Sequence, residues 1–296
     1  MALTINIDTD KTISLEEFAE HVNNNVDSRD EGSLCESAFM LKALSNNKDF
    51  FTNALNDELQ NWEDFQGTNL YTAQTFTYDI GGDFMVRANI WVPPAEIPQD
   101  QTWTNEMFYY LVPHDHNFSF LTVGYFGSGY ETTIYEYDGG KVLGELGEKV
   151  DLKFLEHTKL SEGKIMFYRA NKDIHSQSHP EEFSISLNLL AAPPEQGFKD
   201  QYCFDFDTGK ISNDVATTNL TRMMLCKFSK YVGDGKSVNL LESIAERHPA
   251  SRVRAEAYDS LASLEPVGYE HIWRKALLDK SSYVQRKARN KIDTIV

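Results

Sequence analysis

Two histidines separated by a single residue, His114 and His116, have side chains and a spacing that suggest metal binding. Residues two apart on a β-strand point to the same face of the sheet, so both imidazoles could bind one ion. A third histidine, His175, follows the hydrophobic run 164–170 and a short turn. Strands far apart in sequence face each other across a closed β-barrel. We therefore predict that these three histidines form one metal site. The alternative third ligand is His179.

The elements that must position these histidines are predicted from the hydrophobic pattern. Residues 1–70 indicate helices: Ser14-Leu-Glu-Glu17 is a capping box, and helices are expected after it, over 33–44 and over 48–62. From residue 71 onward, short aromatic and β-branched runs bounded by Gly, Pro and Asp are typical of strands. The predicted strands are 71–80, 84–92, 106–116, 118–126, 130–138, 164–170, 182–191, 201–207 and 221–228.

The C-terminal part is helical again, with helices predicted over 240–248, 252–264, 269–279 and 282–295. Val253 and Val284 occupy equivalent positions 31 residues apart (284−253), and two further pairs share this offset. Paired helices at this repeat length resemble HEAT-type α-solenoid units. Basic side chains on these helices indicate solvated faces or, alternatively, a docking surface for an acidic partner. They are Arg252, Arg254, Arg274, Lys275, Arg286, Lys287, Arg289 and Lys291.

These patterns predict a mainly β chain in three parts. Residues 1–70 form an N-terminal helical segment that packs on a barrel, residues 71–231 form the barrel with the metal site, and residues 236–296 form a HEAT-like helical region. About nine short strands separated by turn signals favour a sandwich or barrel over alternating βα units.

Composition and charge limit the classes of function. The formal net charge of −17 argues against a general nucleic-acid binder and against binding to an anionic membrane surface. The first ten residues lack the basic and apolar regions of a secretory signal, and no apolar run approaches the roughly 20 residues of a membrane span. Three widely spaced cysteines disfavour a disulfide framework. A cytoplasmic protein is expected.

Two segments carry a resemblance to a known superfamily. VPHDHNFSFLTVGYFGSGY and GKIMFYRANKDIHSQSHPEEFSISLNLL are similar to the two motifs of the cupins, whose fold is a double-stranded β-helix, or jelly-roll, barrel. More specifically, they resemble the three-histidine thiol dioxygenases of the cysteine dioxygenase type, over residues 71–228. The resemblance implies Fe(II) bound by His114, His116 and His175, and oxidation by dioxygen without an organic cosubstrate. Zinc or nickel is the alternative metal.

The chain departs from that family at the substrate-recognition positions. No glutamate follows His116 closely as a fourth ligand, and residues 118–121 contain no cysteine for a cross-link to tyrosine. Ala73 stands where the family has its carboxylate-binding arginine, after a Tyr-Thr pair. The family's Ser-His-Tyr relay falls on Ser186, Asn188 and Leu190, so only the serine remains. The departures predict iron chemistry on a substrate other than cysteine.

Strand alternation supplies further candidates for the site. Arg87 shares one face of its predicted strand with Met85, Asn89 and Trp91, and an inward Arg87 would bind a substrate carboxylate. The alternative is an outward arginine on a solvated sheet. Ser186 and Asn188 also share a face, and inward placement would line the pocket beside the metal as catalytic residues.

The sequence therefore predicts an enzyme, a mononuclear non-haem Fe(II) oxygenase acting on a small amino-acid-like molecule or on a peptide, with dioxygen as co-substrate. The C-terminal helices are the expected surface for a protein or peptide partner, because solenoids commonly bind polypeptides. The alternative is a non-catalytic cupin module for binding or regulation, with a structural metal and the solenoid as its interaction surface.

Overall fold

The computed structural model describes residues 3–64, 66–67, 69, 71–72, 74–97, 108–215, 217–265 and 269–294. The chain divides into two compact units. The first unit comprises Met1–Val142, Lys149–Gln196 and Tyr202–Asn213, and the second comprises Leu143–Glu148, Gly197–Gln201 and Asp214–Val296. This division differs from the sequence-based ranges, which assigned residues up to 231 to the barrel and treated residues 1–70 separately.

The first unit begins with a short strand and a group of helices. They are β1 (Leu3–Ile5), α1 (Leu15–Asn25), α2 (Glu31–Glu36), α3 (Ala38–Asn46) and α4 (Asp49–Gln60). The predicted capping box is present at the start of α1: the Glu17 N–H donates to Ser14 Oγ at 3.2 Å, and the Ser14 N–H donates to a Glu17 carboxylate oxygen at 2.9 Å. These bonds satisfy two backbone donors that a helix start leaves free.

The strands of the first unit form antiparallel sheets. A six-stranded sheet has the order β1-β7-β4-β9-β3-β2, a three-stranded sheet has the order β6-β5-β8, and β10 pairs with β11. The strands are β2 (Thr75–Asp79), β3 (Phe84–Trp91), β4 (Ser119–Phe126), β5 (Tyr130–Glu136), β6 (Lys153–Leu160), β7 (Ile165–Tyr168), β8 (Asp173–Gln177), β9 (Ser184–Ala191), β10 (Tyr202–Asp205) and β11 (Lys210–Asp214).

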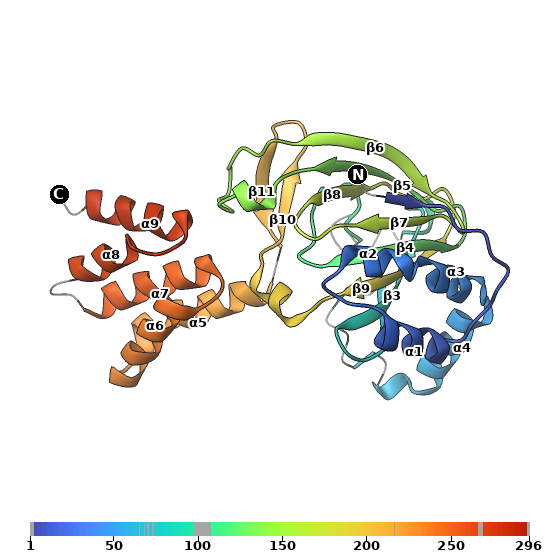
Figure 1. The fold of residues 1–296 in the computed structure, drawn as a ribbon, viewed down its shortest axis with the longest axis horizontal. Coiled ribbons are helices and arrows are strands. Elements are labelled where there is room, and N and C mark those ends of the chain that lie inside the picture. Colours follow the sequence, from blue (N-terminus) through green and yellow to red (C-terminus); the bar gives the residue numbers. More distant parts are fainter. Residues whose placement is uncertain are drawn as a thin grey trace. The chain divides into compact units, whose positions relative to one another are not determined.

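Two hydrophobic cores lie on opposite faces of the six-stranded sheet, one of them against helices α1 to α4, whose ribbons lie along the sheet in Figure 1. Leu187 and Leu189 of β9 pack with buried side chains of helices α1 to α4 on one face. Leu190, on the other face, packs with Tyr130 and Ile134 of the three-stranded sheet. Because side chains alternate along a strand, every second residue of β9 faces the space between the two sheets. That space holds the candidate site.

A third core lies on the far face of the three-stranded sheet. Ile174 of β8 packs there with Tyr202, Phe204 and Ile211 of the β10–β11 pair. In the first unit, helices therefore cover one face of the six-stranded sheet and the three-stranded sheet faces the other, while the β10–β11 hairpin packs against Ile174 of β8 (Figure 1).

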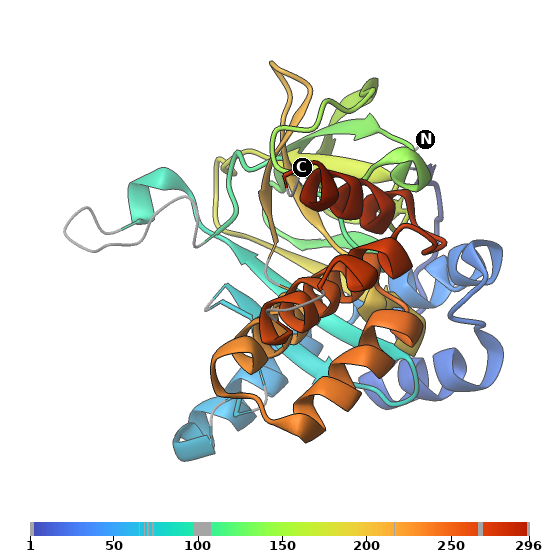
Figure 2. The same cartoon turned by 90° about the vertical axis from the view of Figure 1, so that its left-hand side faces the viewer.

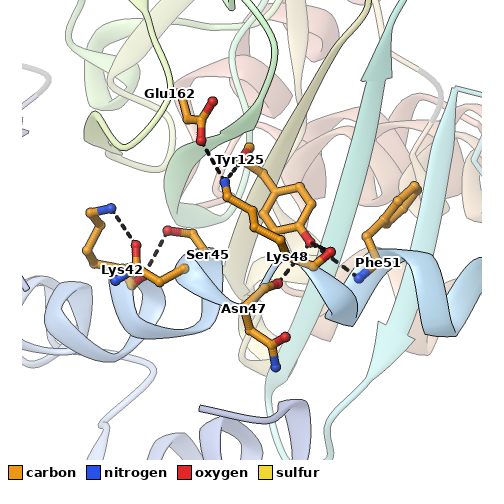
Figure 3. A network of polar contacts seen from close by, with 8 residues as sticks. Lys42, Ser45, Asn47, Lys48, Phe51, Tyr125 and Glu162 are labelled. Atoms are coloured by element: carbon orange, nitrogen blue, oxygen red, sulfur yellow. Dashed lines mark hydrogen bonds and ion pairs between the residues drawn. The ribbon is translucent and has the colours of Figure 1, made fainter. Parts of the chain in front are cut away.

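The turn between α3 and α4 is fastened to β4 by a polar network (Figure 3). The Tyr125 hydroxyl lies 2.9 Å from the carbonyl oxygens of both Asn47 and Lys48. Lys48 Nζ donates in turn to the Tyr125 carbonyl at 2.5 Å and to Glu162 at 2.7 Å. These contacts join the helical layer to the outer face of the six-stranded sheet, opposite the face that carries the site.

The second unit is helical. It contains α5 (Thr218–Val232), α6 (Gly235–Arg247), α7 (Ser251–Leu264), α8 (Glu270–Ala276) and α9 (Ser282–Asp293), drawn from orange to red in Figure 2. Its core includes Val253, Ala257 and Leu261 of α7 with Val284 and Ala288 of α9. The four helices predicted from residue 240 onward are present as α6 to α9, with residue 295 outside the described residues, whereas the HEAT-type resemblance stays a prediction.

The basic side chains of this unit are largely paired with its own acids. Arg254 lies 2.7 Å from Asp279, and both side chains are almost fully buried. Arg252 pairs with Asp214 at 2.8 Å. Further pairs join Arg274 to Glu270, Lys275 to Glu246, Arg286 and Lys287 to Glu145, and Lys291 to Asp259.

Several predicted elements are wrong. Residues 221–228 lie inside helix α5 and are not a strand. Residues 108–116 form only isolated bridges at Tyr110 and His114, while 106 and 107 lie outside the described residues. Strands β1, β6, β8 and β11 were not predicted. The prediction of a mainly β chain is not confirmed, because helices account for 41% and strands for 25% of the structure.

No helix within the described ranges has the length and apolar character needed to cross a membrane.

Candidate metal centre

The segment around His114 is inserted between two strands of the first unit. The backbone N–H groups of His114 and His175 each donate to the other residue's carbonyl oxygen, at 3.0 and 2.9 Å. On its other side, the segment pairs with β10, where the Phe204 N–H donates to the Pro113 carbonyl at 2.8 Å. A pair that exchanges both backbone bonds places its side chains on the same face. The backbone therefore brings His114 beside His175 of β8.

The three imidazoles converge. Nε2 of His175 lies 3.2 Å from Nε2 of His114 and 3.1 Å from Nε2 of His116. The ligand nitrogens of the three residues all lie within 4.8 Å of one another. Two metal–nitrogen bonds of about 2.1 Å, at angles between 90° and 109°, place their nitrogens about 3.0–3.4 Å apart. The two short separations therefore fit ligands of a single ion.

The donor set also fits a divalent transition metal. It consists of imidazole nitrogens, which suit iron, zinc, copper and nickel, and no carboxylate of the described residues belongs to the group. Three neutral ligands leave the ion's charge uncompensated and leave coordination positions open. The group can hold a metal ion, and the identity of that ion does not follow from the ligands.

One hydrogen bond fixes the orientation of His114. Nδ1 of His114 lies 2.8 Å from the carbonyl oxygen of Val112. Since a carbonyl only accepts, Nδ1 carries the proton and Nε2 keeps its lone pair for a metal.

Burial favours the neutral imidazoles that a metal requires. Burial and, to a smaller extent, the positive charge of Arg87 lower the pKa of His114 to about 4, against the opposing hydrogen bond to the Val112 carbonyl. The pKa values of His116 and His175 lie well below their usual range, first because of burial and then because of the neighbouring His114 and Arg87. The three side chains are therefore ready to bind a cation at neutral pH.

Asp115, between the two ligand histidines, points away from them. Its carboxylate accepts from the Tyr137 hydroxyl at 2.5 Å and from the Tyr202 N–H at 2.7 Å, and Asn171 Nδ2 lies 3.4 Å away. Burial raises the pKa of Asp115 to about 6, against these hydrogen bonds. Asp115 thus anchors the His114–His116 segment to the scaffold.

Aromatic side chains line the centre on one side. Phe118 and Phe120 lie 4.8 and 5.1 Å from the ring of His116, and Tyr168 lies 4.7 Å from the ring of His175, measured between ring centroids. Phe120 and Tyr168 stack on each other at 4.8 Å. Such a wall excludes water from this side and strengthens electrostatic interactions at the centre.

Arg87 faces the interior from β3, since Val86 and Ala88 on the same strand pack against the helices. Its side chain is 7% exposed, and its Nε has no hydrogen-bond partner among the described residues. The guanidinium lies 5.3 Å from the Tyr71 ring centroid, and no carboxylate in the described chain forms an ion pair with it. Burial lowers the pKa of Arg87. The predicted inward placement is observed, and the alternative of an outward arginine is wrong.

Ser186 and Asn188 also face the interior. Ser186 Oγ accepts from Trp91 Nε1 at 3.0 Å and interacts with the Tyr130 hydroxyl. Asn188 lies in register with Arg87 and donates from Nδ2 to the Arg87 carbonyl at 3.2 Å. Burial raises the pKa of Tyr130 well above its usual range, so its phenol is protonated at neutral pH.

The structure adds side chains that the sequence analysis missed. Gln177 contacts His175, Tyr130 contacts Ser186, and Asp115 anchors the segment that carries His114 and His116. Gln177 had a usable signal, because it lies two residues after His175 and therefore on the same face of a strand. His179, the alternative third ligand, is not part of the histidine group and lies 4.2 Å from the ring of Tyr110.

Comparisons with known proteins assign no family. No family model matches the chain, and no curated protein matches it. The chain is similar to a solved structure of the DMSP lyases RdDddP and RnDddQII at 12% identity and TM-score 0.23, over 38% of this chain and 40% of that one. It is similar to the 7S globulin of Momordica charantia at 12% identity and TM-score 0.24, over 45% and 36%. It is similar to the DMSP lyase DddQ of Ruegeria pomeroyi DSS-3 at 9% identity and TM-score 0.24, over 66% and 79%. The chain thus spans less than half the length of the first two, and likeness at this level supports no conclusion about activity.

Proposed function

We propose that the first unit is a cupin-type barrel and that the chain is a mononuclear non-haem Fe(II) oxygenase. The observation that carries the proposal is the convergence of His114, His116 and His175, whose ligand nitrogens lie within 4.8 Å in a buried, largely aromatic setting. Bound Fe(II) would supply the activation of dioxygen, which amino-acid side chains cannot provide. The resemblance to the three-histidine thiol dioxygenases supports this choice over zinc or nickel.

Arg87 is the proposed group that binds the substrate. A buried guanidinium without an acidic partner is costly, and a ligand carboxylate would provide the missing charge and accept from the free Nε. Its electrostatic effect on all three histidines indicates that a carboxylate bound there would lie beside the metal ligands. We therefore infer a substrate with a carboxylate, either a small amino-acid-like molecule or a peptide terminus.

Ser186 and Asn188 are the proposed catalytic residues. Ser186 accepts from Trp91, which leaves its hydroxyl hydrogen free to donate to a substrate or to Tyr130. Tyr130 holds its own proton, because burial raises its pKa. Asn188 contacts the backbone of Arg87 and sets the position of that strand segment. Together they would orient the substrate and keep a proton available beside it.

Anaerobic loading with Fe(II) followed by metal analysis tests the site. Wild-type protein should retain close to one equivalent, whereas His114→Ala and His175→Ala should lose it. His157→Ala is the matched control, because His157 is half exposed on β6 and lies outside the histidine group. Less than about a tenth of an equivalent in the wild type, or unchanged binding in both site variants, would refute the iron centre.

Oxygen uptake with size-fractionated cell extract tests the reaction and its substrate class. Uptake that requires iron and is lost in Arg87→Met supports an oxygenase acting on a carboxylate. Uptake confined to the peptide fraction would indicate a peptide substrate and not a small molecule. The second unit would then be the candidate docking surface for that peptide, as expected for paired helices of the HEAT type. An iron-loaded protein without uptake in any fraction favours the second candidate, a non-catalytic binding or regulatory module.

A further inference from the structure

Two buried polar side chains lie next to each other on the three-stranded sheet. Thr132 of β5 is the register partner of Gln177 of β8, so their side chains share one face of the sheet. Tyr130 and Ile134, two residues before and after Thr132, pack in the core between the two sheets, so this face is the interior one. Gln177 contacts His175 at 3.3 Å. The pair therefore lies in the same interior as the three histidines.

Both side chains carry a polar atom that nothing in the described chain satisfies. Thr132 is 0% exposed, and its Oγ1 has no hydrogen-bond partner there. Gln177 is 5% exposed, and its Oε1 has none either. A half-turn of the amide would not change this, because it would leave the NH₂ group in the same unsatisfied place. An unpaired buried polar group costs stability, so two of them side by side point to a function that outweighs the cost.

The facing sheet supplies one polar neighbour of Thr132, namely Tyr168 of β7. Burial raises the pKa of Tyr168 well above its usual range, and the nearby Thr132 hydroxyl acts against that shift. The two hydroxyls are neighbours, yet Thr132 Oγ1 reaches hydrogen-bond geometry with no residue that the structure describes. The Tyr168 ring lies 4.7 Å from the ring of His175, measured between centroids. Thr132 and Gln177 thus meet Tyr168 on the side of the interior where His175 lies.

Arg87 gives the same interior a second polar point. Burial raises the pKa of Tyr130 and the positive charge of Arg87 acts against that shift, so the guanidinium lies close to Tyr130. Tyr130 precedes Thr132 by two residues on the same face of β5. Arg87 Nε is without a hydrogen-bond partner in the described ranges. The interior therefore offers an unsatisfied cationic donor at Arg87 and an unsatisfied hydroxyl and amide at Thr132 and Gln177.

We propose that Thr132 and Gln177 recognise a second polar group of the substrate. The inference rests on the proposed function, in which Arg87 binds the substrate carboxylate, and it narrows the substrate class to carboxylic acids that also carry an amine, hydroxyl or amide. Such a group can pair with the hydroxyl and the amide, whereas an aliphatic acid would leave both unpaired. A site built from buried polar groups rejects ligands that leave them unpaired.

Matched carboxylic acids test the inference. Isovalerate and L-valine differ by an amine, L-valine and L-threonine differ by a hydroxyl in place of a methyl group, and L-leucine and L-asparagine differ by an amide in place of the branched end. Isothermal titration of the full-length protein loaded with Co(II) gives the dissociation constant of each acid. The polar member of at least one pair should bind about tenfold more tightly than its partner, as expected for one net hydrogen bond.

Substitutions assign this preference to the two side chains. Thr132→Val keeps the shape and removes the hydroxyl, and Gln177→Leu removes both polar ends of the amide. Each should reduce the preference to within about twofold. Thr133→Val is the matched control, because Thr133 is the next residue on β5 and its side chain contacts His157 at 2.8 Å on the opposite face.

Thermal unfolding without ligand provides a second readout. Thr132→Val should unfold at a temperature no lower than the wild type, because the substitution removes a buried hydroxyl that forms no hydrogen bond with the described chain. A lower unfolding temperature would mean that the hydroxyl has a structural partner, and it would overturn the proposal. The same measurement shows that each variant folds, and Gln177→Met replaces Gln177→Leu if the latter does not.

A polar preference that either site variant loses and Thr133→Val keeps supports the inference. Equal binding within every pair overturns it, as does a preference that both site variants keep. Arg87→Met separates these failures from failure of the proposed carboxylate site: weaker binding of all the acids in Arg87→Met supports that site, and unchanged binding overturns both proposals. Binding of none of the acids by the wild type also overturns the inference, while Fe(II) retention still tests the metal centre.

Discussion

Asp115 and Tyr202 are joined by two hydrogen bonds. The Tyr202 N–H donates to a carboxylate oxygen of Asp115 at 2.7 Å, and the Asp115 N–H donates to the Tyr202 carbonyl at 3.1 Å. The residues are 87 positions apart in the chain. Because His114 and His116 flank Asp115, this pair determines where both imidazoles sit relative to β10.

Removal of the Asp115 carboxylate should therefore loosen the centre. Asp115→Ala leaves the Tyr202 N–H and the Tyr137 hydroxyl without their acceptor, and each unsatisfied buried donor costs about 1–3 kcal/mol. We expect the free energy of unfolding in urea to fall by roughly that amount or more. Asp115→Asn, which retains one acceptor oxygen, should lose less. Equal losses in the two variants would contradict an anchoring role for the carboxylate oxygens.

Arg87→Met should stabilise the metal-free, ligand-free protein, because it removes a buried guanidinium that has no carboxylate partner in the described chain. Replacement of buried charge by apolar volume is often neutral or stabilising by about 1–4 kcal/mol. Arg169→Met is the contrasting control, since Arg169 pairs with Asp173 and Glu136 and its loss should destabilise. Urea unfolding measures both variants, and a destabilised Arg87→Met would show that internal contacts such as the one with the Tyr71 ring outweigh the cost of burying the guanidinium.

The stability of the metal-free protein should decrease on acidification. The pKa of His114 is depressed from its ordinary 6.5 to about 4. Its contribution to the free energy of unfolding is therefore complete above pH 6.5 and is lost as the pH falls through 4. Each proton taken up only by the unfolded chain lowers stability by about 1.4 kcal/mol per pH unit. Asp115 contributes in the opposite sense: its pKa is raised from 3.8 to about 6, so its contribution is complete below 3.8 and is lost as the pH rises through 6.

Urea unfolding at several pH values between 7 and 4 checks this dependence. His114→Gln should show a shallower decrease than the wild type, because it removes one group whose protonation favours the unfolded chain. An unchanged slope would mean that His114 titrates normally in the folded protein.

In the second unit, Arg254→Met should be strongly destabilising. It leaves Asp279 nearly fully buried and without its 2.7 Å partner, and breaking a buried pair costs about 3–5 kcal/mol. Combining Arg254→Met with Asp279→Leu should restore part of the loss, because no isolated charge remains. Thermal unfolding followed by circular dichroism compares the single and the double variant, and a double variant no more stable than the single one would argue that the pair acts through packing.

Much of the site was predictable because alternation along strands is a local property. The pattern of β3 and β9 placed Arg87, Ser186 and Asn188 on one face, and the spacing of His114 and His116 matched a shared direction. The prediction that His175 joins these two histidines rested on the hydrophobic run that precedes His175 in the chain. The inferences on β3 and β9 needed only the period of two that any strand imposes, whereas His114 and His116 converge although residues 108–116 form only isolated bridges.

The remaining features depend on contacts that no local pattern contains. Residues 221–228 carry a strand-like run, yet they form part of α5, whose Cys226 packs in the helical core of the second unit. Tertiary context overrides local preference there. Strand β6 was missed because charged residues interrupt its alternation, as is common at a sheet edge. The bond between Asp115 and Tyr202 has no sequence signature at all.

The two faces of β9 also separate two kinds of evolutionary change. Leu187 and Leu189 pack against the helical layer, so substitutions there alter the stability of the unit. Ser186 and Asn188 point the other way, so substitutions there alter what the interior can accept. Ligand preference could therefore diverge among descendants of this chain while the helical layer stays the same. A library restricted to the inward positions of β3 and β9 would explore new ligands on an unchanged scaffold.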